Sequence, residues 1–410
     1  MKKSSLSLIM SGVLLFSFFC VSCGKSKSRP SNPDTKLKLA LRSGTYSDVI
    51  KKVIRTFEIE NNVWCEIYEF SEDELHKKVL ESGNQANREF DFLMVDSSWI
   101  AECMSHNILT NLSELGYNLD SDIITATKSV CYKNGSVYLA PFYGNVTVLM
   151  FNKVILREAG YTEETIRTLD DIVDICMYSK SRHNLGFMYR GDTPNNIVVD
   201  FLPILRACGG WVVDENNYPT VNTPEFYKAL NYYLSMIHTG TSAKKEDLVM
   251  AIANSSAALG IGWPGWYKPS EKEPLDYTSF VGRCRENQVR YNSNIYGIWT
   301  VGIPENSRNK IIAVKLLEYI MNPDVQKSTI PSGGVPCRYS SLSDPKVLAK
   351  YPQYEAVLSA LENGIYRPVM EEWTQFYTVL GNELKMIFDG RLSIEEGLEE
   401  AQEKLENLLK

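Results

Sequence analysis

The stretch VYLAPFYGNVTVLMFN, residues 137–152, is where the fold of this chain is decided. An apolar, strand-like run is broken by Pro141 and Gly144, and a second run of β-branched and aromatic residues then leads into a helical pattern. The pattern predicts that one strand leaves a first lobe and the next enters a second, with Tyr143 and Asn145 at the crossing. The same residues also fit a strand, a turn and a strand within one sheet, so the flanking sequence has to distinguish the two interpretations.

Before this stretch, strand-like and helical segments alternate. Strands are expected at 37–41, 63–70 and 90–95, with helices after the first two. This alternation predicts a parallel, doubly wound α/β sheet, in which ligands bind beyond the carboxyl ends of the strands. That rule places one set of residues at the rim of a cleft: Thr45, Tyr46, Asp96, Ser97, Ser98 and Trp99. Asp and Ser at 96 and 97 also suit a helix N-cap, and capping is compatible with ligand contact.

After the stretch, a second α/β unit follows. Helices are expected at 153–159, from Thr168 and from Thr223, and a buried strand at 257–261. A strand at 297–303 is expected to return to the first lobe. The chain should therefore cross between two lobes more than once.

The segment GIGWPGWY, residues 260–267, formally matches the dinucleotide motif G-x-G-x-x-G. That motif needs a helix to open at its third glycine, and the loop-like residues that follow here exclude it. What the segment offers is Trp263 and Trp266 on a glycine-proline frame at the end of a strand. Such rings predict a stacking platform for a ligand, or else they fill a gap in the core.

The N-terminus has the features of an export signal. Two lysines precede an apolar segment in residues 1–22, and Cys20-Val21-Ser22-Cys23 resembles a lipoprotein cleavage site, although Cys20 stands where that motif usually has leucine. Residues 23–35, rich in Ser, Lys and Pro, are expected to form a flexible tether. The sequence thus predicts an exported protein anchored to a membrane by lipid at Cys23, with a plain secreted protein as the alternative.

Composition and motifs exclude several functions. The formal charge of −7 and the lack of a basic run with aromatics disfavour nucleic acid as a partner. The cysteines after the tether are scattered without a C-x-x-C pair, and the four histidines lie far apart, so no metal site is expected. No hydrolase, metalloprotease or P-loop motif is present, so neither catalysis nor a cofactor is expected.

With these segments placed, the chain from about residue 36 to 410 resembles extracellular solute-binding protein family 1, the sugar-binding lipoproteins and periplasmic proteins that serve ABC importers. The resemblance depends on the order and spacing of short motifs: FDFLMVDSSW (90–99), VYLAPFYGN (137–145), VLMFNK (148–153), GGW (209–211), GIGWP (260–264), NPDVQ (322–326), GGVP (333–336) and RP (367–368).

The resemblance implies a two-lobed periplasmic-binding-protein fold of the class II type. The N-terminal lobe would comprise 36–145 and 298–337, and the C-terminal lobe 146–297 and 338–410. Hinge crossings are implied near Tyr143–Val148, Tyr291–Ile298 and Pro336–Ser341. A ligand would bind in the cleft between the lobes, and their closure would present it to the membrane permease.

Position by position, the resemblance implies that the residues matching cleft motifs touch the ligand: Asp96, Ser97, Trp99, Tyr143, Asn145, Gly210, Trp211, Trp263, Trp266, Gly334, Arg338, Glu372 and Trp373. These residue types suit a sugar, which stacks its C–H face on aromatic rings and bonds its hydroxyls to planar polar groups. We therefore expect a monomeric receptor for a sugar, and for an oligosaccharide in particular. The alternatives are the same fold with a polyamine or peptide as ligand, and an exported glycan-active enzyme.

Overall fold

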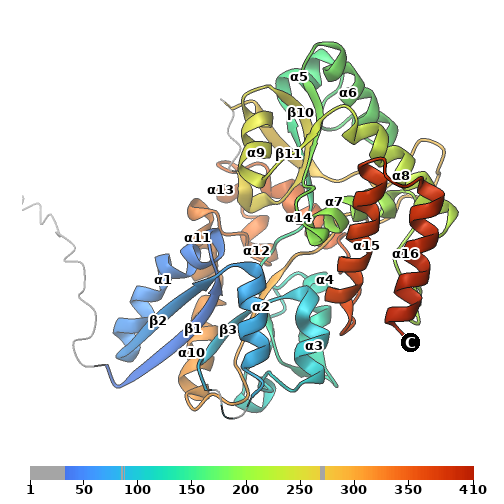
Figure 1. Ribbon diagram of the computed structural model, residues 1–410. Coiled ribbons are helices and arrows are strands. Elements are labelled where there is room, and N and C mark those ends of the chain that lie inside the picture. Colours follow the sequence, from blue (N-terminus) through green and yellow to red (C-terminus); the bar gives the residue numbers. More distant parts are fainter. Residues whose placement is uncertain (1–32, 85, 87, 268–272) are drawn as a thin grey trace, which may run out of the picture.

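The computed structural model of the chain describes residues 33–84, 86, 88–267 and 273–410. The predicted signal peptide and all but the last three residues of the predicted tether lie outside the described residues. The chain forms two lobes, each with its own five-stranded sheet (Figure 1). This arrangement confirms that the stretch at 137–152 joins two sheets, because its first strand belongs to one sheet and its second to the other.

The first lobe combines its sheet with packed helices: β1 (Thr35–Arg42), α1 (Thr45–Asn61), β2 (Val63–Phe70), α2 (Glu72–Glu81), β3 (Phe92–Asp96), α3 (Ile100–Ser105), α4 (Thr125–Lys128), β4 (Tyr132–Lys133), β5 (Ser136–Val137), β6 (Ala140–Tyr143), β12 (Trp299–Gly302), α10 (Lys310–Ile320) and α11 (Pro323–Thr329). The strand order is β2-β1-β3-β12-β6. β1 is parallel to β2 and β3, but β12 is antiparallel to β3 and β6. The sheet is mixed because β12 returns from the second lobe, as predicted.

The second lobe is a separate α/β unit: β7 (Val148–Asn152), α5 (Lys153–Glu158), α6 (Leu169–Ser181), β8 (Leu185–Tyr189), α7 (Pro194–Ala207), α8 (Pro224–Ile237), β9 (Thr241–Ser242), α9 (Lys245–Ala253), β10 (Ala257–Gly262), β11 (Leu275–Ser279), α15 (Trp373–Phe388) and α16 (Ile394–Leu408). The strand order is β11-β7-β10-β8-β9. The antiparallel pairs β11–β7 and β7–β10 make this sheet mixed as well.

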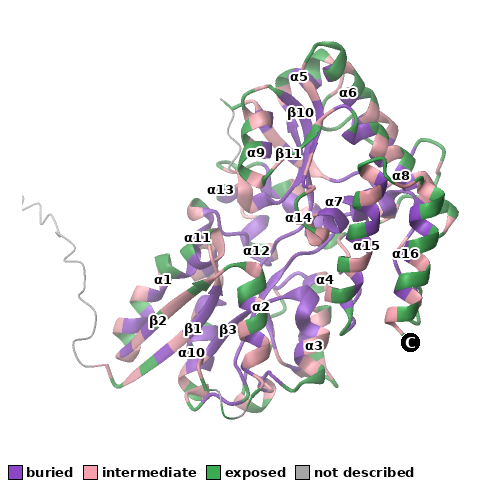
Figure 2. Cartoon of the chain, in the orientation of Figure 1, coloured by how far each residue is buried: buried purple, intermediate pink, exposed green. Residues whose placement is uncertain are grey.

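Local signals in the sequence set the helix ends. The capping boxes predicted at Thr168 and at Ser393 are both present, with Asp171 and Glu396 as their reciprocal partners. The central strands of both sheets, β3, β12, β7 and β10, are fully buried, and α16 is buried on one face only (Figure 2). The cysteines within the described residues are buried.

Two connecting segments run side by side between the lobes. Residues 144–147 lead from β6 to β7, and residues 280–298 lead from β11 back to β12. Val146 pairs antiparallel with Tyr296, and the amide of Thr147 donates to the carbonyl of Ile295 at 2.9 Å. The two crossings therefore form a short ribbon that holds the lobes together.

A third segment joins this ribbon at Ile365, which pairs in parallel with Ile295. The amide of Ile365 donates to the carbonyl of Asn294, and the amide of Tyr296 donates to the carbonyl of Ile365, both at 2.9 Å. The resemblance implied instead that the third crossing lies at Pro336–Ser341. In the structure, the segment around residue 338 forms a β-bridge to Ile123 of the first lobe.

The helices between these two points are α12 (Tyr339–Leu342), α13 (Pro345–Leu348) and α14 (Tyr354–Glu362). α14 packs against β11 of the second lobe and against α4 of the first. Residues 339–362 therefore bridge the lobes, whereas the predicted boundary assigned them to the second. α15 packs against α7 and α16, within the second lobe.

Candidate binding site between the lobes

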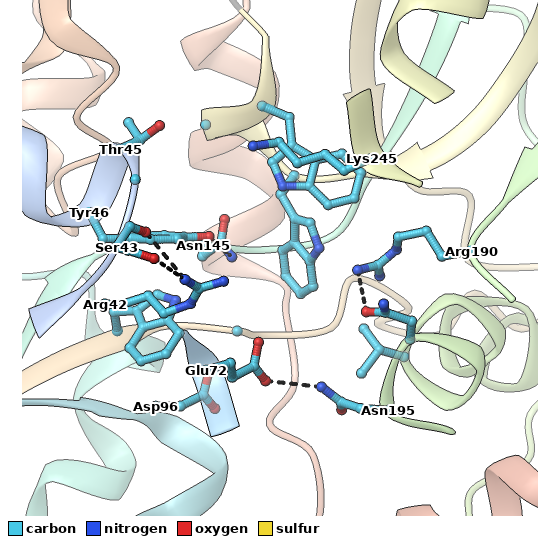
Figure 3. A pocket seen from close by; sticks show the side chains of 18 of the residues that line it. Arg42, Ser43, Thr45, Tyr46, Glu72, Asp96, Asn145, Arg190, Asn195 and Lys245 are labelled. Carbon is cyan, nitrogen blue, oxygen red and sulfur yellow. Dashed lines mark hydrogen bonds between the residues drawn. The ribbon is translucent and has the colours of Figure 1, made fainter. Parts of the chain in front are cut away.

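A cavity of about 440 Å³ lies between the lobes, next to the connecting segments (Figure 3). The first lobe lines it with residues from the ends of β1, β3 and β6 and from the start of α2. The second lobe adds residues from the loop after β8, the start of α9 and the loop after β10. Five strands thus direct their carboxyl ends towards this cavity, which is the position expected for a ligand site in an α/β protein.

Three aromatic rings form the first-lobe wall of the cavity. The ring of Tyr46 lies edge to face with Tyr143, at 4.9 Å between centroids, and 5.4 Å from the ring of Trp299. Burial raises the pKa of Tyr46 to about 12, so its phenol is neutral at physiological pH. The hydroxyl of Tyr143 donates to the carbonyl of Gly333 at 2.6 Å, and this bond fixes its ring.

Trp263 and Trp266 form the opposite wall, which the second lobe contributes. Trp263 is buried against Gly297 of the connecting ribbon, where an added Cβ would lie 2.8 Å from the indole ring. Trp266 is partly exposed and is approached by two cations, Arg190 at 5.0 Å and Lys245 at 5.9 Å from its ring centroid. The loop after β10 therefore presents rings to the cavity instead of burying both in the core.

An ion pair lies between the end of β3 and the third connecting segment. Oδ1 of Asp96 accepts hydrogen bonds from Nη2 of Arg367 at 2.5 Å and from the amide and hydroxyl of Ser98 at 2.8 and 2.7 Å. Both side chains of the ion pair are buried. Asp96 therefore caps the turn at Ser97–Trp99, as predicted, and also neutralises an arginine at the base of the cavity.

Arg190 is fixed in the second-lobe wall by its own partners. It is paired with the buried Asp200 through Nη2 and through Nε at 3.1 Å, and Nη1 donates to Asn196 at 2.6 Å. All three guanidinium nitrogens are thus engaged. Its Cζ lies over the ring of Trp266, 5.0 Å from the ring centroid.

One side-chain hydrogen bond spans the cavity. Nδ2 of Asn195, in α7, donates to Oε1 of Glu72, in α2, at 3.0 Å (Figure 3). Burial, followed by the charge of Asp96, raises the pKa of the Glu72 carboxyl, although Arg367 and other arginines oppose this shift. The two lobes are therefore in contact across the cavity, through the side chains of Asn195 and Glu72.

Several polar atoms of the lining are buried without a hydrogen-bond partner among the described residues: Asn145 Oδ1, Asn195 Oδ1, Arg42 Nε and Arg367 Nε. An unsatisfied buried polar atom costs about 1–3 kcal/mol. Their convergence on one cavity indicates a site built for a polar ligand.

The structure brings five of the residues predicted to touch ligand into the cavity lining: Asp96, Tyr143, Asn145, Trp263 and Trp266. Ser97 and Trp99 lie directly behind Asp96 and are buried. The ring of Trp99 stacks on His76 at 4.6 Å and meets Trp299 edge to face, so it supports the wall of the cavity and does not line it.

The other predicted residues do not line the cavity. Trp373 is buried in the second-lobe core, stacked on Phe376, and Glu372 immediately precedes its helix. Arg338 is buried in the first lobe, where it donates to Asp120 and Asp122 at 2.8 and 3.2 Å.

Gly210, Trp211 and Gly334, from the GGW and GGVP motifs, also lie outside the cavity lining. Gly210 packs against Leu205, and Trp211 lies near Arg206. Gly334 packs tightly against Thr329. These residues maintain packing within the lobes, and nothing in the structure supports ligand contact for them.

The lining also contains residues that the sequence analysis did not select as ligand contacts: Arg42, Glu72, Arg190, Asn195, Lys245, Trp299 and Arg367. A signal for two of them was available, because Arg42 ends β1 and Arg190 directly follows β8. The rule that ligands bind beyond the carboxyl ends of strands applies to both.

The fold and the site define a two-lobed solute-binding protein. The sequence profile described as "Bacterial extracellular solute-binding protein" matches residues 52–356. The chain belongs to this family.

Relatives support the same fold over nearly the whole chain. The chain is 19% identical to a probable amino-acid ABC transporter periplasmic-binding protein of Sinorhizobium fredii, over 92% of this chain and 89% of the relative. It is 22% identical to a mannitol-binding protein of Pseudomonas aeruginosa, over 70% and 72% of the two chains. The maltose-bound MalE3 of T. maritima matches with a TM-score of 0.80 and 22% identity, covering 91% of this chain and 100% of that one.

Proposed function

We propose that the protein is the sugar-binding receptor of an ABC importer, which captures its ligand between the lobes and delivers it to a membrane permease. The observation that carries this proposal is the composition of the cavity. Aromatic rings from both lobes, among them Tyr46 and Trp266, face planar polar groups such as Asp96, Asn145 and Asn195. Rings provide stacking surfaces for the C–H face of a sugar, and planar groups provide donors and acceptors for its hydroxyls.

The ligands named for related proteins support a sugar or polyol. Maltose and mannitol appear in the names of two of them, although another is named for an amino acid. The cations of the lining disfavour a polyamine, because Arg42, Lys244 and Lys245 would repel a polycation. An amino acid or a short peptide remains the competing ligand class in the test below.

The proposal includes the location of the receptor. Export by residues 1–22 and lipidation of Cys23 would place the binding domain outside the membrane, and we infer that it acts as a monomer without catalysis. Among the residues that the structure describes, no helix is both long and apolar enough to span a membrane.

Thermal unfolding in the presence of candidate ligands tests the proposal. A ligand that binds only the folded state stabilises it by about 2.7 kcal/mol at a hundredfold excess over its dissociation constant. We expect a sugar to raise the melting temperature, and Trp266→Ala to abolish the shift. Trp211→Ala is the matched control, because its ring lies outside the cavity lining.

The negative results are equally specific. A shift with an amino acid, peptide or polyamine, and with no sugar, would contradict the sugar assignment. Chemical conversion of a sugar by the protein, abolished by Asp96→Asn without loss of binding, would contradict a purely binding role.

A further inference from the structure

Arg42 differs from the other arginines of the cavity in how it is bonded. Its Nη1 donates to Ser43 Oγ at 2.7 Å and to the carbonyls of Ser43 and Phe70 at 3.4 Å (Figure 3). All three acceptors are neutral, and all three bonds use the same nitrogen. The guanidinium is therefore held in place at one corner, without a charged partner.

The opposite edge of this guanidinium has no hydrogen-bond partner among the described residues. Nε is buried and has no hydrogen-bond partner, and no hydrogen bond is formed by Nη2 within the part of the chain described. Nε and Nη2 lie on one side of the guanidinium and donate in parallel. This edge has the geometry that binds the two oxygens of a carboxylate.

The remaining arginines of the lining are already neutralised. Arg190 is paired with Asp200, and Arg367 is paired with Asp96. Within the described residues, Arg42 is the one arginine of the lining that makes no ion pair. Arg42 is thus a cation of the lining that, within the described residues, is bonded directly to neutral acceptors and to no carboxylate.

Glu72 is the carboxyl group available to pair with Arg42, and it does not do so. Its Oε1 accepts from Asn195, and no ion pair with Arg42 is formed within the part of the chain that the structure describes. Burial raises the pKa of Glu72, and Arg42 is among the cations that oppose this shift. On the second lobe, Lys244 and Lys245 add two further cations, of which Lys245 lies 4.0 Å from Glu246 at the partly exposed rim.

Resting on the sugar-binding function proposed above, we propose that the ligand is an acidic sugar, such as a uronic acid, whose carboxylate binds the Nε–Nη2 edge of Arg42. The aromatic walls bind the ring of the same sugar, and Lys245 favours its negative charge from the opposite lobe. Carboxylate binding would supply the missing partner for Nε. Charge-assisted bidentate bonds of this kind are the strongest that the cavity can offer.

The test compares acidic sugars with their neutral counterparts on the purified full chain. The pairs are galacturonate with galactose, glucuronate with glucose, and digalacturonate with galactobiose, with galactose 1-phosphate as a second anion. Melting temperature identifies binders, and titration calorimetry measures their affinities. We expect the acidic member of at least one pair to bind at least about tenfold more tightly than the neutral member, and this preference to weaken at high salt.

Substitutions then test whether Arg42 causes the preference for the acidic sugar. Arg42→Gln should reduce affinity for the acidic sugar about 10- to 100-fold, a larger loss than for its neutral counterpart. Arg42→Lys, which keeps the charge and loses the paired donors, should recover only part of the affinity. The matched control is Arg308→Gln, an exposed position beside Lys36 at the amino end of β1, which should change neither affinity.

The outcomes separate this inference from the function on which it rests. Binding of neutral sugars alone, or of the sugar phosphate alone, would overturn the inference and leave a sugar receptor. Equal loss of acidic and neutral binding in Arg42→Gln would also overturn it. If no sugar binds, the proposed function fails, and the inference fails with it. If Arg42→Gln does not fold, the inference is tested by the salt dependence of acidic-sugar binding and by Arg42→Lys. No effect of salt, together with full affinity in Arg42→Lys, would overturn it.

Discussion

Asn195 of the second lobe donates a 3.0 Å hydrogen bond to Glu72 of the first, directly across the cavity. The bond joins the N-terminal turn of α7, in the second lobe, to the N-terminal turn of α2, in the first lobe. It is therefore in a position to stabilise the closed arrangement of the lobes. A receptor that encloses its ligand gains affinity from every contact that favours closure.

Removing this bond should weaken ligand binding without unfolding either lobe. We expect Asn195→Ala to reduce ligand affinity by about three- to tenfold, the loss of one hydrogen bond to a polar partner. Titration calorimetry measures the change. Asn231→Ala is a suitable control, since its side chain bonds only to Tyr227 of its own helix, and it should leave affinity unchanged. Unaltered affinity in Asn195→Ala would show that the bond does not favour closure.

The raised pKa of Glu72 predicts a pH dependence of stability. A carboxyl whose pKa is raised above its ordinary value of 4.5 in the folded state contributes most stability when it is protonated, and that contribution is lost as pH rises through the raised pKa. The groups facing Glu72 are Asp96, which raises this pKa further, and Arg367, Arg42 and Arg190, which lower it.

We therefore expect the wild type to lose more stability between pH 5 and pH 8 than Glu72→Gln, in which nothing titrates at this position. Urea unfolding at several pH values measures the difference. Parallel pH profiles for the two proteins would contradict the raised pKa.

The buried ion pair at the base of the cavity should be important for stability. Asp96→Asn leaves Arg367 as an uncompensated buried charge, and we expect the free energy of unfolding to fall by about 3–5 kcal/mol. The exposed pair between Lys385 and Asp389 provides the control. Asp389→Asn should cost less than about 1 kcal/mol. Equal effects of the two substitutions in urea unfolding would contradict the structural role of Asp96.

Gly265 lies where the second lobe approaches the hydroxyl of Tyr143 in the first. An added Cβ would lie 2.1 Å from that oxygen, so Gly265→Ala should prevent full closure while each lobe still folds. We expect at least about a tenfold loss of ligand affinity, because the closed state is less populated. Adding Tyr143→Phe, which removes the obstructing oxygen, should restore part of the affinity. If the double variant does not recover affinity, the steric conflict does not involve the hydroxyl of Tyr143.

The elements of the fold were predictable where the signal is local. Apolar and polar residues roughly alternate in the strand at 63–70, and the strand at 257–261 is continuously apolar. The capping boxes at Thr168 and Ser393 depend on neighbours three residues away. The third crossing was not predictable in this way, because the pairing of Ile365 with Ile295 joins residues far apart in the chain.

The site was predictable to the extent that strand ends define it. Asp96 ends a strand, and Asn145 and Trp266 follow strands, whose carboxyl ends meet at the cavity, and each of the three residues lines it. Arg338 was expected to touch the ligand, but sequence does not distinguish a guanidinium that binds ligand from one that is saturated by Asp120, Asp122 and neighbouring carbonyls. Arg42 was missed for the converse reason, since only the structure shows that one of its edges has no partner.

The most direct measurement of the proposed function is titration calorimetry of the purified protein with neutral and acidic sugars, amino acids and polyamines. We predict that one sugar series binds with one molecule per chain, and that Trp266→Ala abolishes this binding while Trp211→Ala preserves it. Binding of an amino acid or a polyamine, together with no binding of any sugar, would contradict the assignment of this protein as a sugar receptor.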